Sequence, residues 1–247
     1  MYCSFIYFQF METYSYGIDF FSDEVLENAV HRLMRRVDDA LIRHNPHTNI
    51  IDPFAAIFEA SLLKISLDEW FPTEVTRQLN KTLSNAVGDF HQDLLGRLPG
   101  WESTGTSGGY YDLKSTKPFG VNQQLAIAEV KNKYNTLNSG GKEKIYDNFQ
   151  NLRALPEYKN HTFYLIEIIQ RQSSGDIEWQ LSNRAARKDI RRIGAQQVYA
   201  ETTGQGDAFF RLFNAVTRVL EEKYGFDQQS SQSISAAELF GKAYDRG

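Results

Sequence analysis

Leu-Ala-Ile-Ala-Glu-Val-Lys-Asn, residues 125–132, is the stretch around which the chain is organised. Five of its first seven side chains are apolar, which is typical of a β-strand buried on both faces. Glu129 and Lys131 should project to the same side, because side chains two residues apart in a strand share a face. Asp112 comes seventeen positions before Glu129, in a second short strand-like run after Gly108 and Gly109. An Asp followed by a Glu and a Lys at a strand end predicts a metal-dependent site that cleaves phosphodiester bonds.

These residue types suit that chemistry for direct physical reasons. Asp112 and Glu129, brought together by adjacent strands, would bind Mg²⁺ through carboxylate oxygens, and the backbone carbonyl of Val130 would add another ligand. The bound metal lowers the pKa of a water molecule and neutralises charge on the phosphate and the leaving oxygen. The Lys131 ammonium would help to orient the attacking water and offset charge in the transition state.

The Glu-x-Lys tripeptide alone is a weak signal. It occurs three times, at residues 129–131, 157–159 and 221–223, but only the first copy ends an apolar strand. An ordinary charged strand end is the commoner interpretation of such a tripeptide, and the presence of Asp112 shifts that balance only moderately.

A family resemblance favours the nuclease interpretation. Asp112 followed by residues 129–131 resembles the motif of the PD-(D/E)XK nuclease superfamily, with Tyr111 where the superfamily name has proline. More narrowly, the region from about Ile51 to Phe213 resembles type II restriction endonucleases that cut GGNCC and GGWCC sites. The stretches that carry this resemblance are NAVGDFHQ (85–92), PGWE (99–102), YDL (111–113), AEVKNKYNT (128–136) and YAETTG (199–204).

The resemblance implies a fold, a cofactor and a substrate. It implies an α/β core with a central mixed sheet flanked by helices, Mg²⁺ as cofactor, and double-stranded DNA cut at a short GGNCC-like palindrome to give 5′-phosphate and 3′-hydroxyl ends. In such nucleases a helix before the first catalytic strand often adds a polar residue to the site. Asp89, Gln92 and Glu102 are therefore second-rank candidates, although an exposed polar face explains each of them equally well.

Charge is distributed unevenly along the 247 residues. The net charge of −4 does not by itself suggest a DNA-binding protein, but residues 1–30 hold five acids and no Lys or Arg. Local basic patches attract phosphates more directly than total charge does, and Arg or Lys matches the paired acceptors of guanine in the major groove. A solvated helix face is the plain alternative. The DNA-binding candidates are Asn132, Lys133, Asn135, Lys142, Lys144, Arg184, Arg187, Lys188, Arg191 and Arg192.

The chain divides into four predicted parts. We expect a peripheral segment at 1–21 whose first ten residues carry no function, a helical part at 22–98, a nuclease core at 99–226 with a DNA-reading region at about 171–206, and a tail at 227–247. Apolar spacing and capping residues predict helices at 23–43, 52–63 and 74–98, the last beginning after Thr73. A helix at 142–155 followed by an apolar strand at 162–171 predicts a parallel strand pair.

The leading hypothesis is a type II restriction endonuclease acting as a homodimer, because cutting both strands of a palindrome needs two equivalent sites. A cognate DNA methyltransferase would belong to the same system without binding this chain. No stretch suggests a membrane span, and the lone Cys3 suits a reducing cytoplasm. The alternatives are a repair or recombination nuclease that recognises DNA structure, and a DNA-binding protein that keeps the fold without catalysis.

Overall fold

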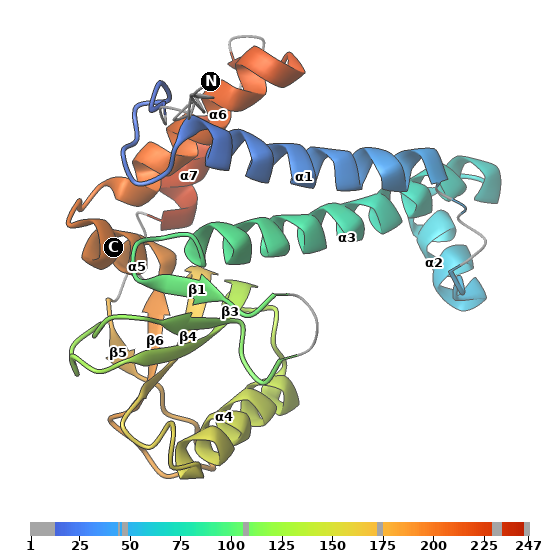
Figure 1. Ribbon diagram of the computed structural model, residues 1–247. Coiled ribbons are helices and arrows are strands. Elements are labelled where there is room, and N and C mark those ends of the chain that lie inside the picture. The colour runs from blue at the N-terminus through green and yellow to red at the C-terminus, as the bar shows by residue number, and fades with distance from the viewer. Residues whose placement is uncertain are drawn as a thin grey trace, which may run out of the picture.

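The computed structural model contains a mixed six-stranded sheet with helices on both faces and a long helical arm (Figure 1). It describes residues 13–43, 45, 49–105, 109–171, 175–228 and 234–244, so the first ten residues lie outside the described part. The helices are α1 (Asp23–Arg43), α2 (Pro53–Leu63), α3 (Leu67–Leu95), α4 (Ser139–Ala154), α5 (Ala195–Thr203), α6 (Ala208–Tyr224) and α7 (Ala236–Tyr244). The strands are β1 (Trp101–Ser103), β2 (Leu113–Ser115), β3 (Ala126–Lys133), β4 (Thr162–Ile169), β5 (Ile177–Glu178) and β6 (Ile190–Gly194).

The sheet has the strand order β1-β2-β3-β4-β6-β5. β3, β4 and β6 are parallel, and the outer strands β1, β2 and β5 pair antiparallel. α4 connects β3 to β4, which confirms the predicted parallel pair across a helix and the mixed α/β sheet. Because the three central strands are parallel, their carboxyl ends lie at one edge of the sheet.

Helices cover the two faces of the sheet unequally. α4, below the sheet in Figure 1, packs Tyr146 and Phe149 against a face that includes Ile127 and Phe163. The opposite face, with Tyr164 among its buried side chains, packs against α3 and α5, and α6 packs against α5 in the same core. The molecule therefore has a larger core above the sheet and a smaller one below it.

The arm consists of α1 packed along α3, with α2 at its far end (Figure 1). The prediction that α3 begins after Thr73 is wrong, because the helix starts at Leu67 and passes through Pro72. The Ser66 hydroxyl accepts a hydrogen bond from the Glu69 N–H at 3.2 Å, and the Glu69 carboxylate accepts one from the Ser66 N–H at 2.8 Å. This reciprocal cap fixes the start of the helix, and Pro72 removes one backbone hydrogen bond within it.

The apolar side chains of α1 and α3 that lie near the body of the molecule are buried. Leu26 and Val30 of α1 and Ala86 and Leu94 of α3 lie in buried positions. Leu83 of α3, which falls in the apolar spacing of the helix, is nevertheless 40% exposed.

The two ends of the described chain join the main core. Residues 13–21 were expected to be peripheral, but Tyr16, Ile18 and Phe21 are buried beside α6 residues in that core. Phe240 of α7 is buried in the same cluster, within the stretch expected to be a tail. No helix in the described ranges is both long and apolar enough to cross a membrane.

Candidate active site

Asp112 lies immediately before β2 and is fixed against β3. Its N–H donates to the carbonyl of Ala128 at 2.9 Å, which extends the strand pairing by one residue. Its carboxylate Oδ2 accepts a hydrogen bond of 2.8 Å from the N–H of Val130. The side chain is thereby held beside the strand that carries Glu129.

Glu129 and Lys131 project to one side of β3, as the two-residue spacing predicted. The Lys131 Nζ lies 2.6 Å from Glu129 Oε1 and 3.1 Å from the Val130 carbonyl oxygen. The side chains of Glu129 and Lys131 are about a quarter exposed, at 22% and 26%. The Asp, the Glu, the Lys and the backbone carbonyl therefore meet in one partly desolvated place.

This desolvation changes the acidity of both carboxyl groups. Burial raises the pKa of Asp112 above its ordinary value, against the opposing effects of the Val130 N–H and the Lys131 charge. Burial also raises the pKa of Glu129, and the nearby charge of Asp112 raises it further. Because each carboxyl group resists ionisation beside the other, a bound cation would stabilise the charged form of both.

The donor set fits a hard divalent cation. Among the described residues no group of three His, Cys, Asp or Glu side chains converges as a ready-made metal cluster. Mg²⁺, however, is usually bound by one or two carboxylates with water and substrate oxygens completing the octahedron. Asp112, Glu129 and the Val130 carbonyl supply such oxygens, and the Lys131 ammonium contacts two of them directly.

The same face of the sheet carries a second charged pair that sequence reasoning did not identify. In the sheet register, Glu167 of β4 is opposite Lys131 of β3. Leu165 of β4 lies between Glu129 of β3 and Arg192 of β6, opposite both of them. The Arg192 Nη2 lies 2.5 Å from Glu167 Oε2, and the Glu167 side chain is 3% exposed. Glu167 is the single charged residue within β4, and that isolated carboxylate is the signal that could have revealed it.

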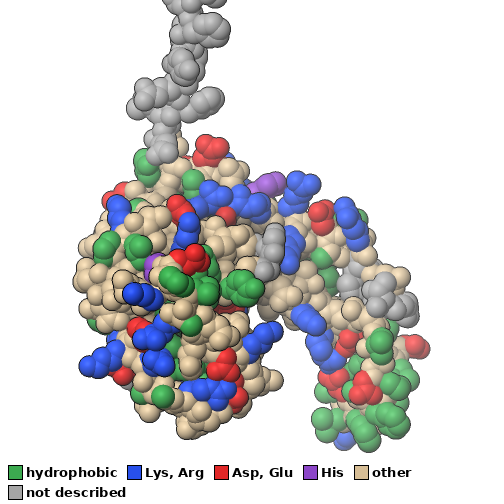
Figure 2. All heavy atoms as spheres, turned by 60° about the horizontal axis from the view of Figure 1, so that its bottom comes forward, with side chains coloured by type: hydrophobic (Ala, Val, Ile, Leu, Met, Phe, Trp, Pro, Cys, Tyr) green, Lys and Arg blue, Asp and Glu red, His purple; other side chains and the backbone are tan. Residues whose placement is uncertain are grey.

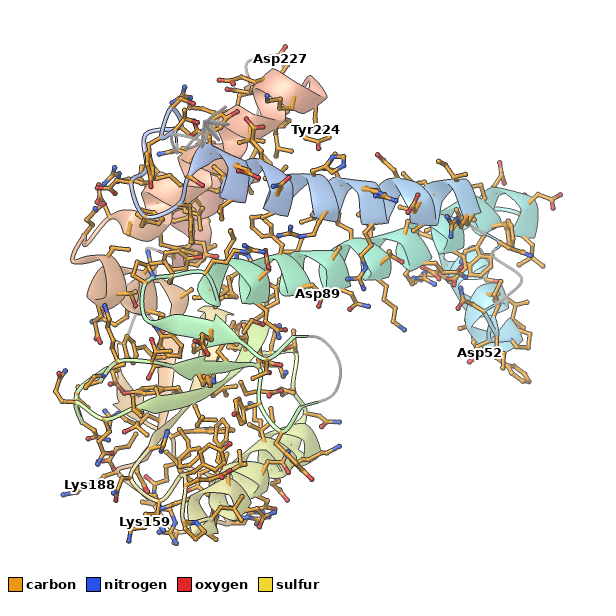
Figure 3. The ribbon with its side chains drawn as sticks, in the orientation of Figure 1. Asp52, Asp89, Lys159, Lys188, Tyr224 and Asp227 are labelled. Carbon is orange, nitrogen blue, oxygen red and sulfur yellow. The ribbon has the colours of Figure 1, made fainter. Side chains whose placement is uncertain are left out.

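The second-rank acids are placed differently from one another. Asp89 of α3 is paired with Arg36 of α1, and its charge raises the pKa of Asp112. In Figure 3 Asp89 points from α3 toward the side of the sheet. Glu102 of β1 lies 3.0 Å from Lys114 in a cross-strand ion pair.

Gln92 is the third residue in this second-rank group. Its amide Nε2 lies 3.5 Å from the Gly105 carbonyl oxygen, at the start of the loop that leads to Asp112. Of the three second-rank candidates, Asp89 is therefore the one whose charge acts directly on a carboxylate of the site.

The predicted basic run of residues 184–192 does not form one patch. Arg184 donates two hydrogen bonds of 2.8 Å to the carboxylate of Asp147 on α4. Arg191 is buried against Asp176 on the opposite face of the sheet from Arg192. Lys188 precedes the amino end of β6, and Figure 3 shows it far from Asp89.

Arg187 also precedes β6, and its Nε is buried without a hydrogen-bond partner among the described residues. Of the run, only Arg192 belongs to the face and the strand end that carry Glu129 and Lys131.

The other polar candidates lie in the last residues of β3, in the turn after it and in the first turns of α4. Lys133 is the last residue of β3, and Asn135 lies in the turn after it. Lys142 is in the first turn of α4, where the Asn138 side chain accepts a hydrogen bond of 2.8 Å from the Gly141 N–H. The remaining members of this group are Asn132 at the end of β3 and Lys144 of α4.

Comparisons with known proteins identify the family of this chain. The chain is 33% identical over 250 residues to the type II restriction enzyme Eco47II of Escherichia coli, covering 92% of this chain and 98% of that enzyme. It is 28% identical over 211 residues to the type II restriction enzyme Sau96I of Staphylococcus aureus, covering 80% of this chain and 76% of that enzyme. A family model described as Eco47II restriction endonuclease matches residues 18–224. Because this model matches most of the chain, the chain belongs to the Eco47II restriction endonuclease family.

Proposed function

We propose that this restriction endonuclease is a type II enzyme that uses Mg²⁺ to cut both strands of a short GGNCC-like palindrome, leaving 5′-phosphate and 3′-hydroxyl ends. The observation that carries the proposal is the convergence of Asp112, Glu129 and Lys131 at the end of β3. Membership of the family supplies the enzyme class, and these three residues supply the chemistry.

Each residue has a defined part in this mechanism. Asp112, Glu129 and the Val130 carbonyl would hold the metal, and the hydrogen bond from the Val130 N–H fixes the orientation of the Asp112 carboxylate. Mg²⁺ supplies the Lewis acid that activates water and neutralises the developing charge on the phosphate oxygens. The Lys131 ammonium, which contacts Glu129 Oε1 and the Val130 carbonyl, would help to orient the attacking water and offset charge on the scissile phosphate. Asp89, whose charge raises the pKa of Asp112, would add a further carboxylate if its ion pair with Arg36 opened.

The DNA would occupy the hollow between the arm and the body. Figure 2 shows this hollow, with Lys or Arg side chains on both of its sides. The first turn of α4, which carries Lys142, would face the phosphate backbone, because the N-terminus of a helix favours anions. Asn132, Lys133, Asn135, Lys144 and Arg192 would add contacts at the catalytic end of the sheet.

The remaining basic candidates, Arg184, Arg187, Lys188 and Arg191, belong to the proposed DNA-reading region at about 171–206. Phosphate contacts are commoner than base contacts for individual basic residues. Arg184 is paired with Asp147, and Arg191 is paired with Asp176. Either arginine would have to leave its ion pair before it could contact DNA.

The biological setting follows from the activity. A homodimer would bring two identical sites to the two strands of a palindrome. A cognate DNA methyltransferase would protect the host genome without binding this chain, and both enzymes would work in the cytoplasm.

One digestion experiment tests the proposal. Purified protein is incubated with unmethylated phage DNA, with and without Mg²⁺, and the fragment ends are sequenced. Discrete Mg²⁺-dependent fragments that end at GGNCC-type sites are expected. A smear of fragments would instead favour a structure-directed repair nuclease, and intact DNA that is nevertheless bound would favour a non-catalytic DNA-binding protein.

Three single variants test the site within the same assay. Asp112→Ala, Glu129→Ala and Lys131→Ala are each expected to abolish cleavage and to leave the circular dichroism spectrum unchanged. Full activity in any one of them would remove that residue from the proposed site.

A further inference from the structure

The far end of the arm exposes a large apolar surface. Six side chains on α2 and just before it form what we call the arm-tip patch: Ile50, Phe54, Ile57, Phe58, Leu62 and Leu63. Ile50 is fully exposed, and Phe54, Phe58 and Leu62 are 68%, 70% and 81% exposed. Figure 2 shows apolar side chains gathered at this end of the arm, across the hollow from the body.

The patch belongs to a well-formed helix. The Asp52 carboxylate accepts a hydrogen bond from the Phe54 N–H at 2.9 Å, and Pro53 occupies the first turn. At the other end the Lys64 N–H bonds back to the carbonyls of the last turn in a left-handed conformation. Because both ends are capped, the exposed side chains are presented on a fixed helical surface.

The composition of α2 is that of a helix buried on several sides. Only Ala56 and Ala60 are buried, where the helix meets α3. Glu59 is the single charged residue among eleven, and its carboxylate is held by the Trp70 indole N–H at 3.0 Å and by Arg77 at 2.7 Å. A helix that is apolar all round normally lies inside a protein or an assembly.

The size of the patch matches one side of a stable protein interface. At roughly 200 Å² for a fully exposed large side chain, the six residues together expose on the order of 800 Å². A typical monomer shows no apolar patch larger than about 300–600 Å². A standard interface buries about 800 Å² on each partner.

The chemistry of the patch identifies its occupant. It contains no charged side chain, so two copies brought face to face meet no like-charge repulsion, and it offers no cation to a DNA phosphate. We propose that the arm-tip patch is the self-complementary surface through which two copies of this chain form a two-fold symmetric dimer. The proposal rests on the proposed function in one respect, because cleavage of a palindrome calls for the second copy that the patch would bind.

The first test measures mass in solution without DNA or metal. Wild-type protein at micromolar concentration should sediment at twice the 28.4 kDa of one chain. The double variant Phe58→Asp/Leu62→Asp should sediment as a monomer with an unchanged circular dichroism spectrum, because both side chains are largely exposed in one copy. Leu155→Asp, which places the same charge at an exposed leucine after α4, should remain a dimer.

The second test detects the contact directly. In a Cys3→Ser background, Phe58→Cys should form a disulfide-linked dimer on mild oxidation, since the centre of a two-fold interface meets its own copy. Lys159→Cys, an equally exposed position far from the arm in Figure 3, should stay unlinked.

The outcomes separate this proposal from the proposed function. A monomeric wild-type protein, or a double variant that stays dimeric, would overturn the dimer interface. A double variant that remains dimeric but no longer binds DNA would assign the patch to DNA instead. A wild-type dimer that fails to cut DNA would overturn the function and leave the interface standing.

Discussion

The Asp112 carboxylate accepts a 2.8 Å hydrogen bond from the backbone N–H of Val130, the residue whose carbonyl oxygen lies 3.1 Å from the Lys131 ammonium. One peptide segment of β3 therefore positions the acid of the neighbouring strand through its N–H and offers an oxygen to a cation through its C=O. The geometry of the site depends on backbone pairing between β2 and β3 as much as on side chains.

The ionised Asp112 carboxylate should lower the free energy of unfolding at neutral pH, because burial disfavours its charged form. A carboxyl group whose pKa is raised by folding favours the folded state only when it is protonated, and this contribution is lost as pH rises above its unfolded value of about 4. Asp112→Asn, whose amide oxygen can still accept from the Val130 N–H, should therefore raise the melting temperature at pH 7.5 while abolishing cleavage. The gain should shrink at pH 4. An equal or larger gain at pH 4 would contradict the assigned cause.

Cation binding should weaken as the pH falls. Burial raises the pKa values of both Asp112 and Glu129, so protons compete with the metal at a higher pH than for ordinary carboxylates. Titration calorimetry with Ca²⁺, which binds similar oxygen ligands, should show affinity falling from pH 8 to pH 5.5. Glu102→Gln, which removes an acid paired with Lys114 instead, serves as the control and should leave this dependence unchanged.

In Asp112→Asn the remaining site carboxyl should titrate at lower pH, because the Asp112 charge is one cause of the raised pKa of Glu129. A pH dependence of Ca²⁺ binding that is identical in wild type and variant would refute the coupling between the two carboxylates.

Breaking the pair of Glu167 and Arg192 should destabilise the protein. Arg192→Ala leaves the nearly buried Glu167 carboxylate without its cation, which should cost about 3–5 kcal/mol in urea unfolding. The double variant Glu167→Gln/Arg192→Ala should recover much of that loss, because the uncompensated charge is gone. Additive losses in the double variant would mean that the two side chains do not interact.

Acid should destabilise the fold through His91. Burial lowers the pKa of His91 to about 4 from an ordinary 6.5, and its Nδ1 has no hydrogen-bond partner among the described residues. The neutral ring favours the folded state above pH 6.5, and that advantage is lost as the pH falls toward 4, by up to about 3 kcal/mol.

His91→Leu, which keeps an apolar side chain beside Phe90 and Phe209, should flatten the fall of unfolding free energy between pH 7 and pH 5. The same slope in wild type and variant would exclude His91 as the cause.

Local signals predicted much of the fold. The spacing of apolar residues placed α1 at its observed bounds, and Asp52 with Pro53 marked the start of α2. The closeness of Asp112 and Glu129 followed from their positions on two short apolar runs, because such runs pair in a sheet. These features depend on residues near one another in the chain.

Long-range partners were the part that the sequence could not supply. Glu167 and Arg192 meet because β4 and β6 pair in one particular register, and Arg184 meets Asp147 because α4 packs beside that region. A basic run is visible in the sequence, but the acids that pair with it are not. Likewise, the apolar stripe of α3 has the same period whether it faces a core or solvent, as at Leu83.

α3 is one continuous helix of 29 residues, which at 1.5 Å per residue makes a rod of about 43 Å. Near its start it carries Trp70, against which α2 packs, and toward its end it carries Asp89, whose charge acts on the Asp112 carboxyl. The length of α3 therefore sets the distance between the arm tip and the site formed by Asp112 and Glu129. An insertion or deletion in its middle would change that spacing and also rotate the two ends by about 100° per residue relative to each other.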